Sequence, residues 1–187
     1  MHITDDSKVP TTLLYSNIYQ DPNWGHEAPV EEDPIRWFKL LLLKDEDIPE
    51  DVRNSEYLHE ARVKLKAEGL QPIDAVTDYL SMLWKHAMAS IKRARGSAVD
   101  GTPFKVVITV PAIWKPYAKE KMKKAAKNAG ILDYRIAGET TLNFVDEPEA
   151  AALSSLKECA GDIRVSTTVE FYPLANGSLE RRCVRHM

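Results

Sequence analysis

Glycine, cysteine and long apolar runs are scarce in this chain of 187 residues. Its 8 glycines never stand side by side, which leaves no glycine-rich loop of the kind that holds phosphate groups. The two cysteines, Cys159 and Cys183, lack zinc-site spacing, and we expect reduced thiols. The longest wholly apolar runs, such as 40–43, fall far short of the ~20 residues that a membrane span needs.

An excess of one charge is also lacking. The chain has 25 Lys and Arg against 28 Asp and Glu, a formal net charge of -3. No basic field therefore favours nucleic acid, and we expect neither a nucleic-acid nor a membrane partner. The polar, acidic start, residues 1–6, does not resemble a signal peptide, which favours a cytoplasmic location. The 5 histidines are scattered and form no triad or metal-ligand pattern.

Helices and strands are predicted from periodicity and from Pro and Gly boundaries. Residues 9–25 are typical of a β-hairpin, and 35–43 of a short apolar helix. Helices are further expected over 55–68, about 72–94, and 116–129, the last with Ala118, Met122, Ala125, Ala126 and Ala129 facing inward. Residues 104–110 and 131–137 are expected to be strands, the first covered on both faces. Residues 163–171 could form another strand, and 179–187 a frayed basic tail.

The stretch 105–156 is the most informative part of the chain. It opens with Val106-Val107-Ile108-Thr109-Val110-Pro111-Ala112 and closes with Phe144-Val145-Asp146-Glu147-Pro148-Glu149-Ala150-Ala151-Ala152-Leu153. Strand, helix, strand and helix in this order favour a parallel pair of strands joined by a crossover. The Glu-Pro helix start would bring a carboxylate to the edge of that unit.

The residues at 107–112 and 146–152 resemble the nucleotide-binding region of the heat shock 70 kDa chaperones, in the actin-like ATPase superfamily, especially divergent fungal members. Three weaker features follow in the family's order. They are Lys8-Val9-Pro10-Thr11 with Tyr15 and Trp24-Gly25, the segment 35–41, and Gln71-Pro72-Ile73 at the start of a long helix. The resemblance covers about residues 5–158. It implies an α/β fold, a partial actin-like ATPase (ribonuclease H-like) lobe with a mixed sheet and flanking helices.

The resemblance also implies a division of the chain. Residues 1–158 would form the partial ATPase domain, with a hairpin and helical insert over 9–103 and the strand-helix-strand unit over 104–158. Residues 159–187 would be a divergent C-terminal tail.

Lys39 and Glu147 are the catalytic candidates that the resemblance implies. A lysine at the position of Lys39 lies near the transferred phosphate in the family, where an ammonium offsets charge on the phosphoryl oxygens. The carboxylate at the position of Glu147 reaches Mg²⁺ through water, so no direct protein ligand to the metal is expected. Each has a plain alternative: Lys39 as a surface lysine, and Glu147 as an acidic residue favoured at a helix start. Asp146 stands where the family usually has a neutral amide.

Pro111 and Lys119 match a hinge or relay between the nucleotide and the partner surface in the family. Pro111 also ends a strand in its own right, because proline cannot donate to a sheet. Lys119 replaces a common arginine, and a lysine cannot make the bidentate contact of a guanidinium.

The phosphate loops of the family have no counterpart in these residues. The family's Asp-Gly-Thr-Thr-like turn is not found, and the region of its second glycine-rich turn reads Gly161-Asp162-Ile163-Arg164-Val165-Ser166. We therefore expect an ATP-binding fragment of chaperone type, with ATP and Mg²⁺ as the family's cofactors and hydrolysis lost or very weak. Two alternatives remain open: a non-enzymatic module that binds a co-chaperone or client, and a truncated gene product.

Overall fold

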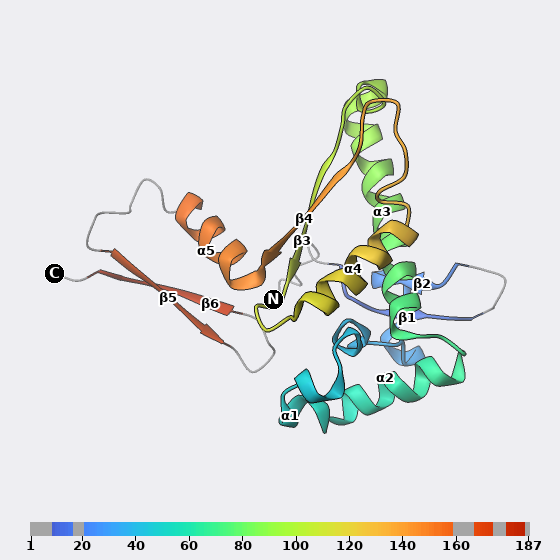
Figure 1. The fold of residues 1–187 in the computed structure, drawn as a ribbon, viewed down its shortest axis with the longest axis vertical. Coiled ribbons are helices and arrows are strands. Elements are labelled where there is room, and N and C mark those ends of the chain that lie inside the picture. The colour runs from blue at the N-terminus through green and yellow to red at the C-terminus, as the bar shows by residue number, and fades with distance from the viewer. Residues whose placement is uncertain (1–8, 17–20, 159–166, 174–178, 186–187) are drawn as a thin grey trace. The chain divides into compact units, whose positions relative to one another are not determined.

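The computed structural model describes residues 9–16, 21–158, 167–173 and 179–185, and side chains only as far as residue 157. Helices are mixed with three two-stranded sheets (Figure 1). The chain divides into two compact units. Unit 1 contains Met1–Lys105 and Lys115–Thr141, and unit 2 contains Val106–Trp114 and Leu142–Met187.

The N-terminal part of unit 1 is a small hairpin, as predicted. Strand β1 (Leu13–Leu14) pairs antiparallel with β2 (Asn23–Trp24). Leu13, which is fully buried, also exchanges two backbone hydrogen bonds with Ile35, at 3.1 and 2.7 Å. The hairpin is thereby tied to the segment that leads into Lys39.

Short helical turns follow the hairpin. They are η1 (Gly25–Glu27), η2 (Val30–Glu32), η3 (Phe38–Leu42), η4 (Asp45–Asp47) and the single α-turn α1 (Glu50–Arg53). The short helix predicted over 35–43 is thus a 3-10 helix over 38–42. It begins after Trp37, whose φ of 61° lies in the left-handed region, and its Phe38, Leu41 and Leu42 are buried.

Two helices then follow where the sequence predicts them. Helix α2 (Glu56–Ala67) begins at Ser55, whose hydroxyl accepts a hydrogen bond from the Leu58 amide. Gly69, with φ of 68°, ends this helical region. Helix α3 (Pro72–Arg95) begins with Pro72, and the Gln71 amide donates to the Asp74 carboxylate at 2.9 Å. The turn η5 (Gly96–Val99) follows it.

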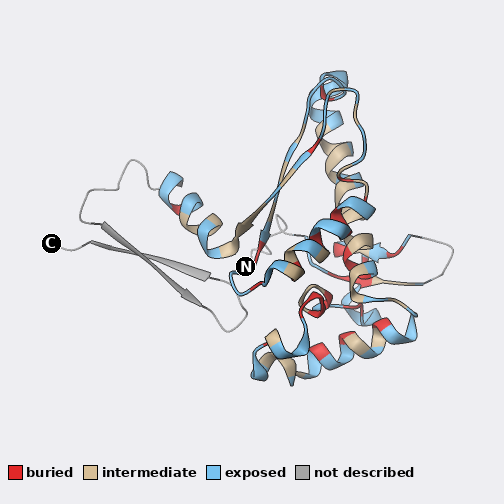
Figure 2. Ribbon diagram, viewed as in Figure 1, coloured by how far each residue is buried: buried red, intermediate tan, exposed pale blue. Residues whose placement is uncertain are grey.

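Helix α4 (Pro116–Asn128) confirms the predicted inward face. Ala118, Met122, Ala125 and Ala126 are buried, as is Ala129 after the helix. The small alanine side chains let α4 pack closely against α3. Figure 2 shows the buried residues of unit 1 gathered on η3 and on the inner faces of α2 and α4.

Strands β3 (Lys105–Val110) and β4 (Thr141–Asp146) are neighbours in one sheet. They run in the same direction in Figure 1, and the Thr141 amide donates to the Phe104 carbonyl at 2.9 Å, where both strands begin. The predicted parallel pair is therefore present. The expectation that β3 is covered on both faces is wrong: its exposure alternates along the strand, and Val107 is 51% exposed.

The strand predicted over 131–137 is also wrong, because this segment forms two turns. Apolar Tyr134 and Ile136 alternate with charged residues as in a strand, but they do not face a core, since they are 89% and 94% exposed. The Arg135 side chain instead contacts η5 and the turn that follows it. Its guanidinium donates to the Val99 and Thr102 carbonyls and lies 4.1 Å from the centre of the Phe104 ring.

The rest of unit 2 begins with helix α5 (Glu147–Glu158). Strands β5 (Thr167–Pro173) and β6 (Leu179–Arg185) pair antiparallel, with Val169 opposite Cys183. The predicted strand over 163–171 is therefore present from Thr167 on, and 163–166 lie outside the described residues. The expected frayed tail is instead strand β6, apart from 186–187, which are outside the description. No helix in the described part is long and apolar enough to cross a membrane.

Candidate functional site

The ends of β3 and β4 bring two of the predicted residues to one edge of a sheet. Pro111 follows directly after β3, and Asp146 ends β4, with Glu147 next in the chain. Because the strands are parallel neighbours, these ends lie at the same edge. Pro111 then begins a tight turn in which the Trp114 amide donates to its carbonyl at 3.0 Å. The carboxyl edge of a parallel sheet is where α/β folds commonly bind ligands.

Glu147 is the first residue of α5 and is half-buried. Two acidic residues, Glu147 and Glu149, lie in the first turn of this helix, where negative charge is favoured by the helix dipole. The position therefore suits both interpretations of the Glu-Pro start, because a carboxylate that begins a helix can also face a hydrated cation. The role of Glu147 stays a prediction.

Lys39 and Lys119 lie in unit 1, on elements that pack against each other. Lys39 is half-buried in η3, whose Phe38 and Leu41 are buried. Lys119 is half-buried in the first turns of α4. The two elements are joined by the Lys121 ammonium, which donates to the Leu42 carbonyl at 2.9 Å. The sheet-edge pair and the lysine pair thus belong to different units.

Tyr117, on α4, bonds to the segment just after η3 and so also holds these two parts of unit 1 together. It was not identified from the sequence. Its hydroxyl donates to the Asp47 carboxylate at 2.6 Å and accepts from the Lys44 amide at 2.8 Å. The ammonium groups of Lys44 and Lys121 lie 5.4 and 5.5 Å from the centre of its ring. Burial and the Asp47 hydrogen bond raise the pKa of the Tyr117 phenol. Only the proximity of Tyr117 to the Pro116 helix start is visible in the sequence.

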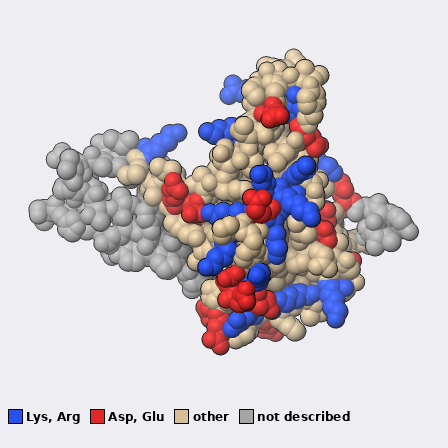
Figure 3. All heavy atoms as spheres, viewed as in Figure 1, with Lys and Arg blue, Asp and Glu red and all other residues tan. Residues whose placement is uncertain are grey.

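Charged groups of both signs lie beside one another on the face shown in Figure 3. Within the described residues, no cluster of three or more His, Cys, Asp or Glu could hold a metal ion. The residues at hand match a magnesium nucleotide only in part. Glu147 and Lys39 supply the expected carboxylate and ammonium, but the isolated glycines supply no backbone cradle for phosphates. We therefore derive no reaction step through a nucleotide.

Comparison with known proteins supports one relationship. The human heat shock 70 kDa protein 12A is 26% identical over 163 residues, which cover 79% of this chain and 22% of that protein. The chaperone protein HscA of Proteus mirabilis is 26% identical over 187 residues, covering 95% of this chain and 27% of that protein. The human heat shock 70 kDa protein 12B is 25% identical over 120 residues, covering 56% of this chain and 17% of that protein.

The chain thus spans about a quarter or less of the length of these relatives. No family model matches it, and no solved structure matches it. None of these three relatives is fungal, so the expected fungal placement stays a prediction. The similarities support an Hsp70-like relationship for this chain.

Proposed function

We propose that these residues are part of an Hsp70-like ATP-binding lobe, and that they hydrolyse ATP very slowly or not at all by themselves. The observation that carries the proposal is the placing of Pro111 and Glu147 at adjacent ends of parallel strands. The low-identity similarity to heat shock 70 kDa proteins supports the same assignment. In finer terms, the lobe would be of the actin-like type and cytoplasmic, with divergent fungal proteins as its nearest kin.

Within this proposal, four residues have separate roles. Glu147 would hold Mg²⁺ through water, and Lys39 would offset negative charge on the terminal phosphate of ATP. Pro111 and Lys119 would relay the nucleotide state to a protein partner. The slow hydrolysis follows from the absent glycine-rich turns, because preorganised backbone amides contribute much of the stabilisation of phosphoryl transfer.

Calorimetry with Mg²⁺-ATP and a phosphate-release assay on the full 187-residue chain test the proposal. We expect weak binding, reduced by Lys39→Ala and Glu147→Gln, and phosphate release near the buffer rate. Lys124→Ala is the matched control, since Lys124 is an exposed lysine of α4. Rapid turnover that Lys39→Ala abolishes would show that the missing loops are not needed. No binding by the unchanged chain would remove the ATP-binding part of the proposal.

A second candidate function, a non-enzymatic interaction module, is favoured by one exposed aromatic pair. Trp37 and Tyr57 are 46% and 63% exposed, and their rings stack with centres 6.0 Å apart. They line a hollow of about 190 Å³ together with Arg36. Trp, Tyr and Arg are the residue types that most often dominate binding energy at protein interfaces. The left-handed backbone of Trp37 costs energy in a bulky residue, which is typical of functional positions.

Affinity capture without nucleotide separates this candidate from the ATP-binding one. We expect a defined protein partner that the unchanged chain retains, that Trp37→Ala loses, and that Val30→Ala still retains. Val30 is a suitable control because it is apolar and 67% exposed but does not line the hollow. Equal capture by Trp37→Ala and the unchanged chain would exclude the aromatic pair as the contact.

A further inference from the structure

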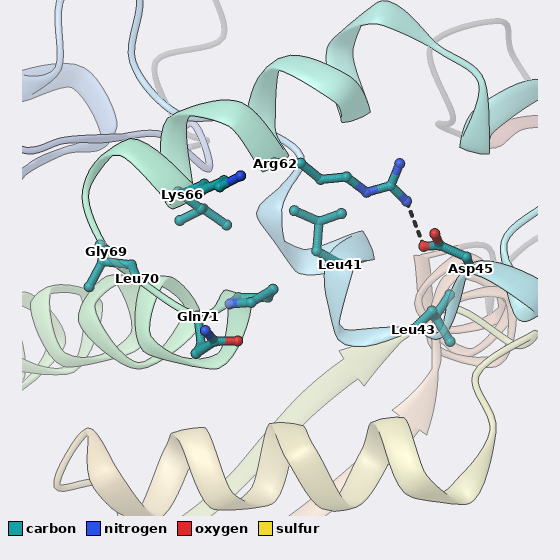
Figure 4. Close-up of a pocket in the computed structure, with 10 residues that line it drawn as sticks. Leu41, Leu43, Asp45, Arg62, Lys66, Gly69, Leu70 and Gln71 are labelled. Carbon is teal, nitrogen blue, oxygen red and sulfur yellow. Dashed lines mark hydrogen bonds and ion pairs between the residues drawn. The ribbon is translucent and has the colours of Figure 1, made fainter.

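An open hollow of about 400 Å³ lies in unit 1, and its lining includes none of the residues that the nucleotide proposal uses. It is bounded by η3, by the second half of α2 and by the turn that leads into α3. Figure 4 shows Leu41 pointing into it, with Arg62 and Lys66 on α2 on one side and Gln71 on the other. Its volume falls within the ~300–1,000 Å³ that small-molecule pockets occupy.

The lining of this hollow is apolar at its base. Leu41, Leu43 and Leu65 are nearly or fully buried, and Leu70 is half-buried. Two backbone hydrogen bonds fix the wall at the α2–α3 turn. The Leu70 amide donates to the Leu65 carbonyl at 2.9 Å, and the Gly69 amide donates to the Lys66 carbonyl at 3.2 Å. Backbone hydrogen bonds therefore hold the wall of the hollow at this turn.

The rim of the hollow carries two cations and one carboxylate. Arg62 donates to Asp45 at 2.6 Å, which pairs the carboxylate with one of the cations. Lys66 is exposed and makes no ion pair within the described part of the chain. One positive charge at the rim is thus left for an incoming anion, and the Gln71 amide can donate from the opposite side.

These features select a ligand class. Leucine side chains at the base favour an aliphatic body, and the one uncompensated cation favours a single negative charge. A nucleotide fits poorly, because the lining has no aromatic ring to stack on a base and Asp45 would repel a polyphosphate. We propose that the hollow binds a free aliphatic monocarboxylate of medium chain length, with its carboxylate at Lys66 and its chain over Leu41 and Leu70.

Titration of the full chain with octanoate, followed by NMR of leucine methyl groups, tests this proposal. We expect saturable shifts at Leu41, Leu65 and Leu70, and binding at least fivefold weaker for octanol, which has the same chain without the charge. Octanoate has two methylenes more than hexanoate, and each contributes about fourfold to binding at full burial. Because the hollow is open and burial is partial, hexanoate should bind about three- to tenfold more weakly than octanoate. Added salt should weaken octanoate binding, because the rim charge is exposed.

Charge reversal locates the carboxylate. We expect Lys66→Glu to weaken octanoate about tenfold and to leave octanol unchanged, whereas Lys124→Glu, on α4, should change neither. Circular dichroism should confirm that both variants keep their helices. Equal effects of the two variants, or octanol binding as tightly as octanoate, would overturn the proposal. So would binding of a short acidic leucine peptide without any binding of octanoate. The result does not depend on ATP binding, so either proposal can fail alone.

Discussion

Replacing Tyr15 with Phe should measurably destabilise unit 1. The Tyr15 hydroxyl donates to the Asp78 carboxylate at 2.8 Å and links the chain just after β1 to the N-terminal half of α3. Both side chains are half-buried. A hydrogen bond to a charged group contributes about 1.5–3 kcal/mol, and partial exposure lowers this to about 1–2 kcal/mol for Tyr15→Phe. For a chain of this length the melting temperature should fall by about 2–8 °C.

The cost of Tyr15→Phe should depend on pH. Burial raises the pKa of Asp78 above 3.8, Asp74 and Asp21 raise it further, and the bond from Tyr15 and the charge of Lys85 lower it. With its folded pKa above its unfolded pKa, Asp78 binds more protons in the folded state between the two values. Its ionisation therefore lowers stability as pH rises through the folded pKa. Loss of the Tyr15 hydroxyl enlarges this penalty.

Urea denaturation of the two proteins at pH 7.5 and near pH 4 measures the effect. The free-energy difference between unchanged chain and Tyr15→Phe should be largest at pH 7.5 and should shrink toward pH 4, where Asp78 takes up a proton. Asp78→Asn is the control, because the amide oxygen still accepts from Tyr15 and the group no longer titrates. A cost that is equal at both pH values, or below about 0.3 kcal/mol at pH 7.5, would refute the reasoning.

Two further substitutions test the core and a turn. Phe38→Ala should lower the free energy of unfolding by about 3–5 kcal/mol in urea titrations, because Phe38 is 1% exposed. The same change at its exposed neighbour, Trp37→Ala, should lower it far less. Gly130→Ala should cost about 1–2 kcal/mol in thermal melts, because Gly130 has φ of 81° and an added Cβ would lie 3.1 Å from an Asp133 oxygen. Gly101→Ala, with its nearest contact at 3.9 Å, should be neutral or slightly stabilising. Equal costs within either pair would contradict these assignments.

The long helices could be predicted because their signals are local. Ser55 and Gly69 mark the ends of α2, Pro72 starts α3, and the alanine spacing of α4 identifies its buried face. Each of these signals acts within a few residues of the place that it determines.

The failed predictions concern segments whose structure is set by distant residues. Residues 131–137 alternate like a strand, but Arg135 binds carbonyls more than 30 residues away and the segment turns instead. The contacts Tyr117–Asp47 and Tyr15–Asp78 join residues 70 and 63 positions apart, which no local pattern reveals. Pro111 and Glu147 could be expected at one sheet edge once the strands were taken as parallel. The roles of Lys39 and Lys119 stay predictions.

The two units share the chain in an interleaved way, which affects how the protein can form. The boundaries fall after Lys105, Trp114 and Thr141. The first segment of unit 2 therefore comes before the second segment of unit 1 in the chain. Helix α4, which packs on α3, is synthesised after β3, and the partner of β3, strand β4, is synthesised later still. During synthesis the half-made sheet must therefore stay single-stranded for some thirty residues while unit 1 closes around α4. A nascent chain of this kind exposes an unpaired strand edge, which would favour contact with a chaperone.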